Sequence, residues 1–203
     1  MSRFGPMREA AGVRFRLWAP EAAEVALIRP DAPAVAMTRG PDGVHAVAVP
    51  AEDGQLYRFR IGDLEVPDPA SRAQADDVEG WSRVVGPLPP PRPRAIRPWP
   101  EAIIAEVHVG TATPRGSFDA LREVLPEYVA AGYTALELMP VADFPGRWNW
   151  GYDGVMPFAP DTAYGTPEAL RALVDAAHDA GLAVLLDVVY KALLHKSGEG
   201  FIS

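Results

Sequence analysis

The sequence contains no cysteine, which excludes disulfide bonds, thiolate metal sites and cysteine nucleophiles. Basic residues are also scarce. The chain has 19 lysines and arginines and 27 acidic residues, which gives a formal net charge of −8. Non-specific binding to nucleic acid or to an anionic membrane needs a basic face, so this balance argues against both. A neutral partner is a better fit to the composition.

Long apolar runs and metal-ligand spacings are missing as well. No stretch of about 18 apolar residues suggests a membrane span, and no apolar run follows Met1, so we expect a cytoplasmic protein without membrane contact. A glycine-rich phosphate loop does not occur. The four histidines are scattered and lack the spacing of metal ligands; they are His45, His108, His178 and His195. Hydrophobic residues nevertheless make up 48% of the chain, enough for a globular core.

The first part of the sequence alternates between apolar and polar residues, as half-buried strands do. Val13, Phe15 and Leu17 alternate with Arg14 and Arg16. Further short segments of this kind, separated by Pro, Gly and Asp, lie at 24–28, 35–38, 44–49 and 56–61. This spacing predicts a β-sandwich over residues 1–85, immunoglobulin-like and of the type found in carbohydrate-binding modules. Such a module serves either a structural or a carbohydrate-binding purpose, and both stay open.

Six prolines between Gly86 and Pro98 mark the next segment. Proline fixes the backbone in extended conformations and is excluded from helix interiors and central strands. We therefore predict a proline-rich linker over residues 86–100. The alternative is a polyproline segment that docks a partner.

After the linker, strand-like and helical patterns alternate, which predicts a parallel sheet joined by helices over residues 101–190. The expected strands are Ala102–Val109, Ala135–Pro140 and Ala183–Tyr190. We expect one helix from the cap Ser117 to about Ala131, kinked or broken in two at Pro126, and a second between Thr166 and Gly181. The buried stripe expected on the second helix consists of Leu170, Leu173, Val174 and Ala177.

The segment between the second strand and the second helix is rich in large aromatic residues. It would lie at the carboxyl end of the sheet, where α/β folds hold their chemistry. Flat rings stack on the apolar faces of sugars while carboxylates and amides bind hydroxyl groups, so this composition favours a sugar site. A satellite hydrophobic cluster is the alternative. The residues concerned are Trp148, Trp150 and Tyr152, with Asp143, Asn149 and Asp153 beside them.

Two further candidates lie near the carboxyl ends of predicted strands. His108 closes the first strand, where a histidine serves either as hydrogen-bonded scaffold or in the site. Asp187 lies within the third strand, and a carboxylate is costly to bury there unless it is paired or functional. We therefore include both residues in the candidate site, whereas His178 lies within the second helix and is expected to be structural.

Four motifs together resemble the malto-oligosyltrehalose trehalohydrolases, which belong to the α-amylase superfamily of glycoside hydrolases. The motifs read EVHVGT from Glu106, LELMPVADFPG from Leu136, WGYDGV from Trp150 and LDVVY from Leu186. Near the amino terminus, VRFRLWAP from Val13 and PDPASR from Pro67 also resemble the family's sandwich and the connection beyond it. The glycogen branching enzymes share this architecture and are the nearest alternative.

The resemblance implies that residues 101–190 are the first three β/α units of a (β/α)8 barrel. It implies hydrolysis of the α-1,4 bond next to the trehalose unit of maltooligosyltrehalose, in trehalose biosynthesis, without a cofactor or a metal. Tyr152 would stack under the sugar whose bond is cut, and Asp187 would match the aspartate of the third-strand motif. Trp150, Asp153 and His108 complete the expected substrate-binding residues, and none of these is assigned a catalytic role.

The family pattern ends abruptly after Tyr190, and residues 191–203 read as a divergent tail. The resemblance places the nucleophile and the acid on the fourth and fifth barrel strands, so we expect an amino-terminal portion that is inactive alone. An unfinished barrel also leaves a strand edge that favours self-association. A non-catalytic α-glucan-binding protein is the alternative from a different functional class.

Overall fold

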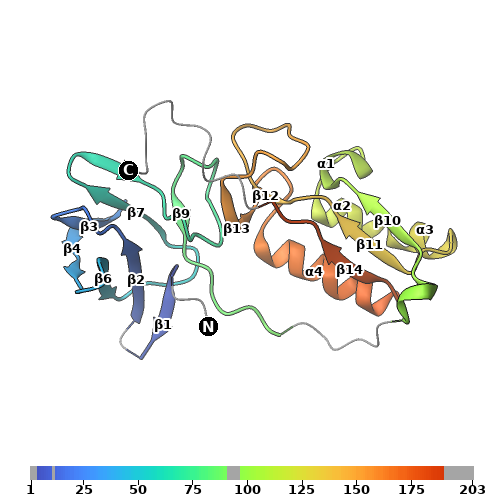
Figure 1. Cartoon of the computed structure of the whole chain (residues 1–203), viewed down its shortest axis with the longest axis horizontal. Coiled ribbons are helices and arrows are strands. Elements are labelled where there is room, and N and C mark those ends of the chain that lie inside the picture. The colour runs from blue at the N-terminus through green and yellow to red at the C-terminus, as the bar shows by residue number, and fades with distance from the viewer. Residues whose placement is uncertain (1–3, 11, 91–96, 190–203) are drawn as a thin grey trace.

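The computed structural model describes residues 4–10, 12–90 and 97–189. Figure 1 shows two groups of elements, one on each side of the view. Within the described residues, no helix is long and apolar enough to cross a membrane. Part of the predicted linker, residues 91–96, and the predicted tail at 191–203 lie outside this range, so the domain boundaries stay predictions.

The first group consists of two antiparallel sheets. One has the strand order β1-β2-β6-β5 and the other β4-β3-β7-β8, with β9 also paired with β7. The bounds are β1 (Met7–Glu9), β2 (Gly12–Trp18), β3 (Val25–Arg29), β4 (Ala32–Ala36), β5 (Thr38–Arg39), β6 (Val44–Val49), β7 (Leu56–Ile61), β8 (Leu64–Val66) and β9 (Ser82–Arg83).

The alternation expected in β2 is confirmed, because Val13, Phe15 and Leu17 are buried while the arginines between them are only half-buried. Their side chains pack against the inner residues of β3 and β7 in one hydrophobic core. The Phe15 ring meets the Tyr57 ring edge-on, with centroids 4.8 Å apart. These contacts between the two sheets confirm the predicted sandwich.

The predicted strand at 35–38 is wrong in its bounds. The chain leaves one sheet at Ala36, the end of β4, and enters the other at Thr38, the start of β5. Met37 between them is buried, and its N–H donates to the Val25 carbonyl at 2.9 Å. The chain keeps the apolar alternation of a single strand while it crosses from one sheet to the other. The sequence pattern therefore predicted one strand at 35–38 where the structure has two.

A buried polar connection holds the segment after β8 against the sandwich. The Tyr57 hydroxyl donates to Asp68 Oδ2 at 2.7 Å, and Asp68 Oδ1 accepts from the Ala70 N–H at 2.8 Å. The Asp68 N–H in turn donates to Ser82 Oγ at 2.9 Å. Burial raises the pKa of Asp68 to about 6, against the lowering effect of the Tyr57 hydroxyl.

The second group contains a parallel sheet with the order β10-β11-β14, as the sequence predicts. The strands are shorter than expected, since Ala102–Val109 narrows to β10 and Ala183–Tyr190 to β14, and Tyr190 lies outside the described residues. The bounds are η1 (Trp99–Glu101), β10 (Ile104–Val107), α1 (Val109–Ala112), α2 (Phe118–Glu123), α3 (Leu125–Ala130), β11 (Ala135–Leu138), α4 (Pro167–Asp179) and β14 (Ala183–Leu186).

The helix starts follow the predicted caps. Ser117 Oγ accepts from the Ala120 N–H, and Thr166 Oγ1 accepts from the Ala169 N–H, each at 3.2 Å. The expected break at Pro126 is also confirmed. Val124 has φ −97° and ψ 4°, and it separates α2 from α3 because proline cannot continue the hydrogen bonding of the preceding helix.

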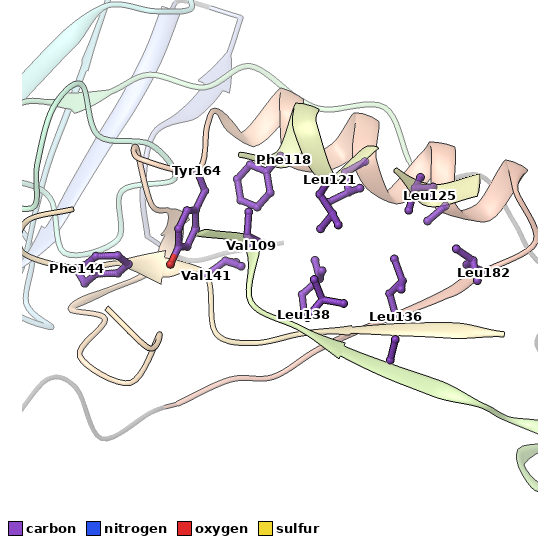
Figure 2. Close-up of a cluster of buried hydrophobic side chains, with 14 residues drawn as sticks. Val109, Phe118, Leu121, Leu125, Leu136, Leu138, Val141, Phe144, Tyr164 and Leu182 are labelled. Atoms are coloured by element: carbon purple, nitrogen blue, oxygen red, sulfur yellow. The ribbon is translucent and has the colours of Figure 1, made fainter. Parts of the chain in front are cut away.

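The core of this group lies between the sheet and its helices. Figure 2 shows Leu136 and Leu138 of β11 opposite Leu121 and Leu125. Of the stripe predicted on α4, Leu173 and Ala177 are buried. Leu170 and Val174 are only half-buried, because they turn toward a surface hollow that Val184 and Leu186 also line.

The two groups touch through the segment between β8 and β9. The Gly146 N–H donates to Asp77 Oδ2 at 2.9 Å, and the Thr162 hydroxyl donates to the Asp76 carbonyl. Val78 joins a small buried cluster with Met156 and Ala159. The sandwich segment therefore contacts the loop region that follows β11.

Candidate carbohydrate-binding site

The three parallel strands end at one level. Val107, Leu138 and Leu186 are register partners. The Met139 N–H donates to the Val107 carbonyl at 3.0 Å, and the Asp187 N–H donates to the Leu138 carbonyl at 2.9 Å. His108 and Asp187 therefore follow the outer two strands at the same carboxyl edge, with main chains about 10 Å apart at a strand spacing of about 4.8 Å.

Between β11 and α4 the chain forms a hairpin that the sequence did not reveal. β12 (Ala142–Asp143) pairs antiparallel with β13 (Met156–Pro160). Residues 144–155 between these strands are called the aromatic loop from here on. At its middle, Gly151 has φ +96°, and an added Cβ would lie 2.4 Å from the Pro140 carbonyl oxygen. Only glycine permits this close approach of the aromatic loop to the end of β11.

His108 links the first strand to the aromatic loop. Its Nε2 lies 2.7 Å from the Asn149 carbonyl oxygen, which can only accept, so Nε2 carries the proton. The Thr111 hydroxyl lies 3.3 Å from Nδ1 and is placed to donate to it. The His108 ring also meets the Trp150 ring edge-on, with centroids 6.2 Å apart. This geometry makes His108 a scaffold for the loop, and direct sugar contact through it stays a prediction.

Three of the four aromatic side chains of the loop face solvent, while that of Phe144 is buried. Trp148 and Trp150 are each 75% exposed and Tyr152 is 43% exposed, so they do not form the alternative satellite hydrophobic cluster. Asn149 Oδ1 accepts from the Gly151 N–H at 2.6 Å, while its Nδ2 donates to Asp153 Oδ2 at 3.0 Å. The loop thus presents flat rings beside an amide and a carboxylate that hold each other in place.

Asp187 lies one residue beyond β14 and is half-buried, so the expectation of a carboxylate inside a buried strand is wrong. It lines a hollow of about 240 Å³ whose wall includes Gly151 and Gly154 of the aromatic loop and Pro140. The structure therefore brings Asp187 to the base of the loop. Among the described residues, the Tyr152 side chain makes no hydrogen bond or ring contact, and it is 43% exposed.

Asp143 does not reach the surface. Its side chain is 0% exposed, so the expectation that it binds sugar hydroxyls is wrong. Burial and then the neighbouring Asp161 raise its pKa to about 8. The sequence misled because Asp143 belongs to β12 and points inward, whereas an irregular loop would expose it.

Tyr164 supports the site and was missed in the sequence. Its ring meets those of His108, Phe118 and Phe144 edge-on, with centroids 5.9 to 6.0 Å apart, and its hydroxyl lies 3.3 Å from His108 Nε2. Figure 2 shows Tyr164 between Phe144 and Phe118. Its position just before the cap Thr166 was the available signal, since residues that precede a helix often pack under it.

The first similarities to known proteins are to a domain family and to solved structures. Residues 3–71 match the model of carbohydrate-binding module 48, the isoamylase N-terminal domain. A crystal structure of a candidate alpha amylase from Salmonella typhimurium has a TM-score of 0.88 and 39% identity, covering 99% of this chain and 38% of that one. A pullulanase from Anoxybacillus sp. LM18-11, solved with maltotetraose, has a TM-score of 0.76 and 25% identity, covering 92% and 34%.

The more specific likeness is to malto-oligosyltrehalose trehalohydrolases, which confirms the resemblance of the motifs. The chain is 40% identical to the one from Deinococcus radiodurans over 91% of its own length and 38% identical to the one from Saccharolobus solfataricus over 97%. It spans about a third of these relatives, 31% and 35% of their lengths. A 1,4-alpha-glucan branching enzyme of Mycobacterium bovis is 36% identical over 88% of the chain and 27% of the relative.

Proposed function

We propose that this chain is a portion of a glycoside hydrolase that acts on α-glucans, and that the aromatic loop binds the glucan. The observation that carries the proposal is that a loop with three exposed aromatic side chains is attached at the carboxyl ends of the parallel strands. Pyranose rings stack on such side chains, and the neighbouring Asn149 and Asp153 offer hydrogen bonds to hydroxyl groups. The likeness to relatives named for glucan substrates supports the same substrate class.

More specifically, we propose hydrolysis of maltooligosyltrehalose with release of trehalose, because the trehalohydrolases match almost the whole chain at up to 40% identity. The three parallel strands would be the first units of a (β/α)8 barrel, whose carboxyl face holds the site. In that role Tyr152 and Trp150 stack on sugar rings, and Asp187 and Asp153 bind hydroxyl groups. His108 holds the loop that carries them.

A retaining glycosidase needs two carboxyl groups about 5 Å apart across the scissile bond. The two site carboxylates, Asp153 and Asp187, are proposed as binding groups, and we place the nucleophile and the acid outside this chain. The chain alone should therefore bind the glucan and release no trehalose. Trehalose release from maltooligosyltrehalose by the purified chain would show that this assignment is wrong.

Titration calorimetry with maltooligosaccharides of increasing length tests the binding site. Tyr152→Ala and Trp150→Ala should each weaken binding by about tenfold, since loss of one stacked ring costs about 1 kcal/mol or more. Trp99→Ala is the matched control for Trp150→Ala, because Trp99 is 71% exposed, close to the 75% of Trp150, but lies in η1, away from the loop. Unchanged affinity in both loop variants would contradict the proposal.

A second candidate is glucan binding by the sandwich without catalysis, and the match of residues 3–71 to a carbohydrate-binding module favours it. Trp18 at the end of β2 is exposed and offers a stacking surface there. Trp18→Ala would abolish binding in that case, while Tyr152→Ala would leave it unchanged. The same titration therefore separates the two candidates.

An exchange of segments distinguishes the proposed trehalose release from the branching reaction. The matched segment of the Deinococcus radiodurans trehalohydrolase is replaced by this chain, and a second chimera is built in the same way on the Mycobacterium bovis branching enzyme. We expect the first chimera to release trehalose. Branching activity of the second with a folded but inactive first would instead favour the branching reaction.

A further inference from the structure

A buried pair of carboxyl groups lies at the base of the aromatic loop. Asp143 ends β12 and Asp161 directly follows β13, and both side chains are almost completely buried. The two strands form a hairpin in which Ala142 is opposite Pro160. The two carboxyl groups therefore lie where the chain enters and leaves this loop region.

The two groups differ in their hydrogen bonds. Asp161 Oδ1 accepts from the Ala163 N–H at 2.7 Å, and its Oδ2 accepts from the Phe144 N–H at 3.2 Å. Both oxygens of Asp143 are buried without a formed hydrogen bond. An isolated carboxylate is very costly in such a place, so Asp143 carries a proton at neutral pH. After burial, the neighbouring Asp161 raises the pKa of Asp143 further, whereas the Thr162 main chain lowers it.

The charged groups that face the pair oppose its ionisation. Asp77, from the sandwich segment, lies close enough to raise the pKa of both Asp143 and Asp161, although burial is the largest cause for each. On the α4 side the neighbouring ionisable group is Tyr164, whose pKa rises to about 12 through burial and then Asp161. In the part of the chain that the structure describes, the charges acting on Asp143 are thus both acidic.

The pair is also connected to the contacts that fix the loop. Phe144, the first residue of the aromatic loop, donates its N–H to Asp161, and Val155 at the other end donates its N–H to the Asp143 carbonyl at 2.8 Å. Gly146 donates to Asp77, while the Thr162 hydroxyl donates to the Asp76 carbonyl. A change in the charge of the pair therefore acts directly on the Phe144 end of the loop, whereas the Val155 end is held by the main chain of Asp143.

We propose that Asp143 and Asp161 share one proton and act together as positioning residues, so that the aromatic loop is held most firmly when the proton is present and opens more readily as pH rises. The effect on glucan binding rests on the proposed function. The opening of the loop does not, because it concerns only the chain itself.

The direction follows from proton linkage. In the closed loop the pKa of Asp143 is about 8, whereas in an opened, solvated loop it returns to about 4. Between these values the closed state holds one proton more than the open state, so the opening constant rises by up to about tenfold per pH unit. Above about pH 8 both states are deprotonated and the opening constant levels off.

Hydrogen exchange of the intact chain, read by mass spectrometry for peptides of 144–155 between pH 5 and 9, tests this. After correction for intrinsic exchange rates, protection should fall up to pH 8 and then level off. Asp143→Asn keeps a donor but cannot ionise, and its protection should depend on pH much less than that of the wild type, with Asp161 alone left to titrate. Asp63→Asn, an exposed carboxylate in a turn, is the control that should keep the wild-type profile.

A flat wild-type profile, or an equal slope in D143N, would overturn the proposal. Hydrogen-exchange protection of α4 shows whether D143N is folded. If D143N is not folded, the pH profile of the wild type alone decides whether the proposal holds. Asp143→Ala should give low protection at every pH, since it removes the donor as well as the charge. Maltooligosaccharide affinity measured over the same range separates the two proposals, because the loop profile stands even where no glucan binds.

Discussion

The sandwich and the parallel sheet cover their apolar residues to different degrees. Most inner residues of β2, β3 and β7 are buried between two facing sheets, and Ile61 at the end of β7 is partly buried. In the parallel sheet, Leu138 of β11 is buried, while its register partner on β14, Leu186, is 49% exposed on the same face. A leucine at the same level of the sheet is therefore buried on β11 and half exposed on β14. The difference shows that the sandwich completes its core, whereas in the described residues the parallel sheet leaves its third strand partly uncovered.

The largest expected effect is a loss of stability of the sandwich. Phe59→Ala removes a completely buried ring between the two sheets and should lower the free energy of unfolding by about 3–5 kcal/mol. Urea unfolding combined with hydrogen exchange of residues 12–61 measures it. Leu64→Ala, on the exposed strand β8, is the control and should change stability by less than about 1 kcal/mol.

The second prediction sharpens the contrast within the parallel sheet. Leu138→Ala should cost about 2–5 kcal/mol, because it leaves a cavity between β11 and the helices. Leu186→Ala should cost clearly less, because that side chain is half exposed already. Hydrogen exchange of β11 and α4 reports both variants. Equal losses would mean that β14 is covered as well as β11.

A third prediction uses the buried Asp68 of the sandwich. Its pKa of about 6 exceeds the unfolded value of about 4, so the folded state holds more protons between these values. Its contribution is complete below pH 4 and is lost as pH rises through 6, by up to about 3 kcal/mol. Asp68→Asn should flatten this part of the profile in urea unfolding from pH 4 to 7. A stability that rises through this range only in the wild type would contradict the sign.

The smallest effect on stability concerns association through the uncovered strand. Leu186→Lys should change the free energy of unfolding by less than about 1 kcal/mol but reduce light scattering of the purified chain, because a lysine on a strand edge opposes pairing with another copy. Val129→Lys, which replaces an equally exposed residue on α3, should leave scattering unchanged. A wild-type chain that is monomeric at all concentrations would remove the basis for this prediction.

The sequence predicted the parts of the fold that depend on local pattern. Alternation located β2, β6 and β7, and the caps Ser117 and Thr166 located two helix starts, because these signals act over a few residues. The crossing at Met37 and the hairpin of β12 and β13 depend on partners far away in the sequence. They leave no local signal, and therefore Asp143 was assigned to the surface.

The candidate site was predicted in its composition but not in its internal contacts. Exposed Trp150 and Tyr152 lie on the carboxyl side of the sheet, as expected from the order of strands. The link from His108 to the Asn149 carbonyl and the packing of Tyr164 could not be predicted, because main-chain acceptors and ring contacts depend on the folded path of the loop. Whether these residues bind sugar stays a prediction.

The close approach of Gly151 to Pro140 determines how the aromatic loop could be redesigned. A Cβ at 151 would lie 2.4 Å from the Pro140 carbonyl oxygen, and the φ of +96° also favours glycine at this position. Gly146 also has a positive φ but has open space around its Cβ position, where asparagine could be accommodated. A library that varies positions 146 to 148 while keeping Asn149 and Gly151 would therefore change the exposed surface of the loop and keep its links to His108 and to the end of β11.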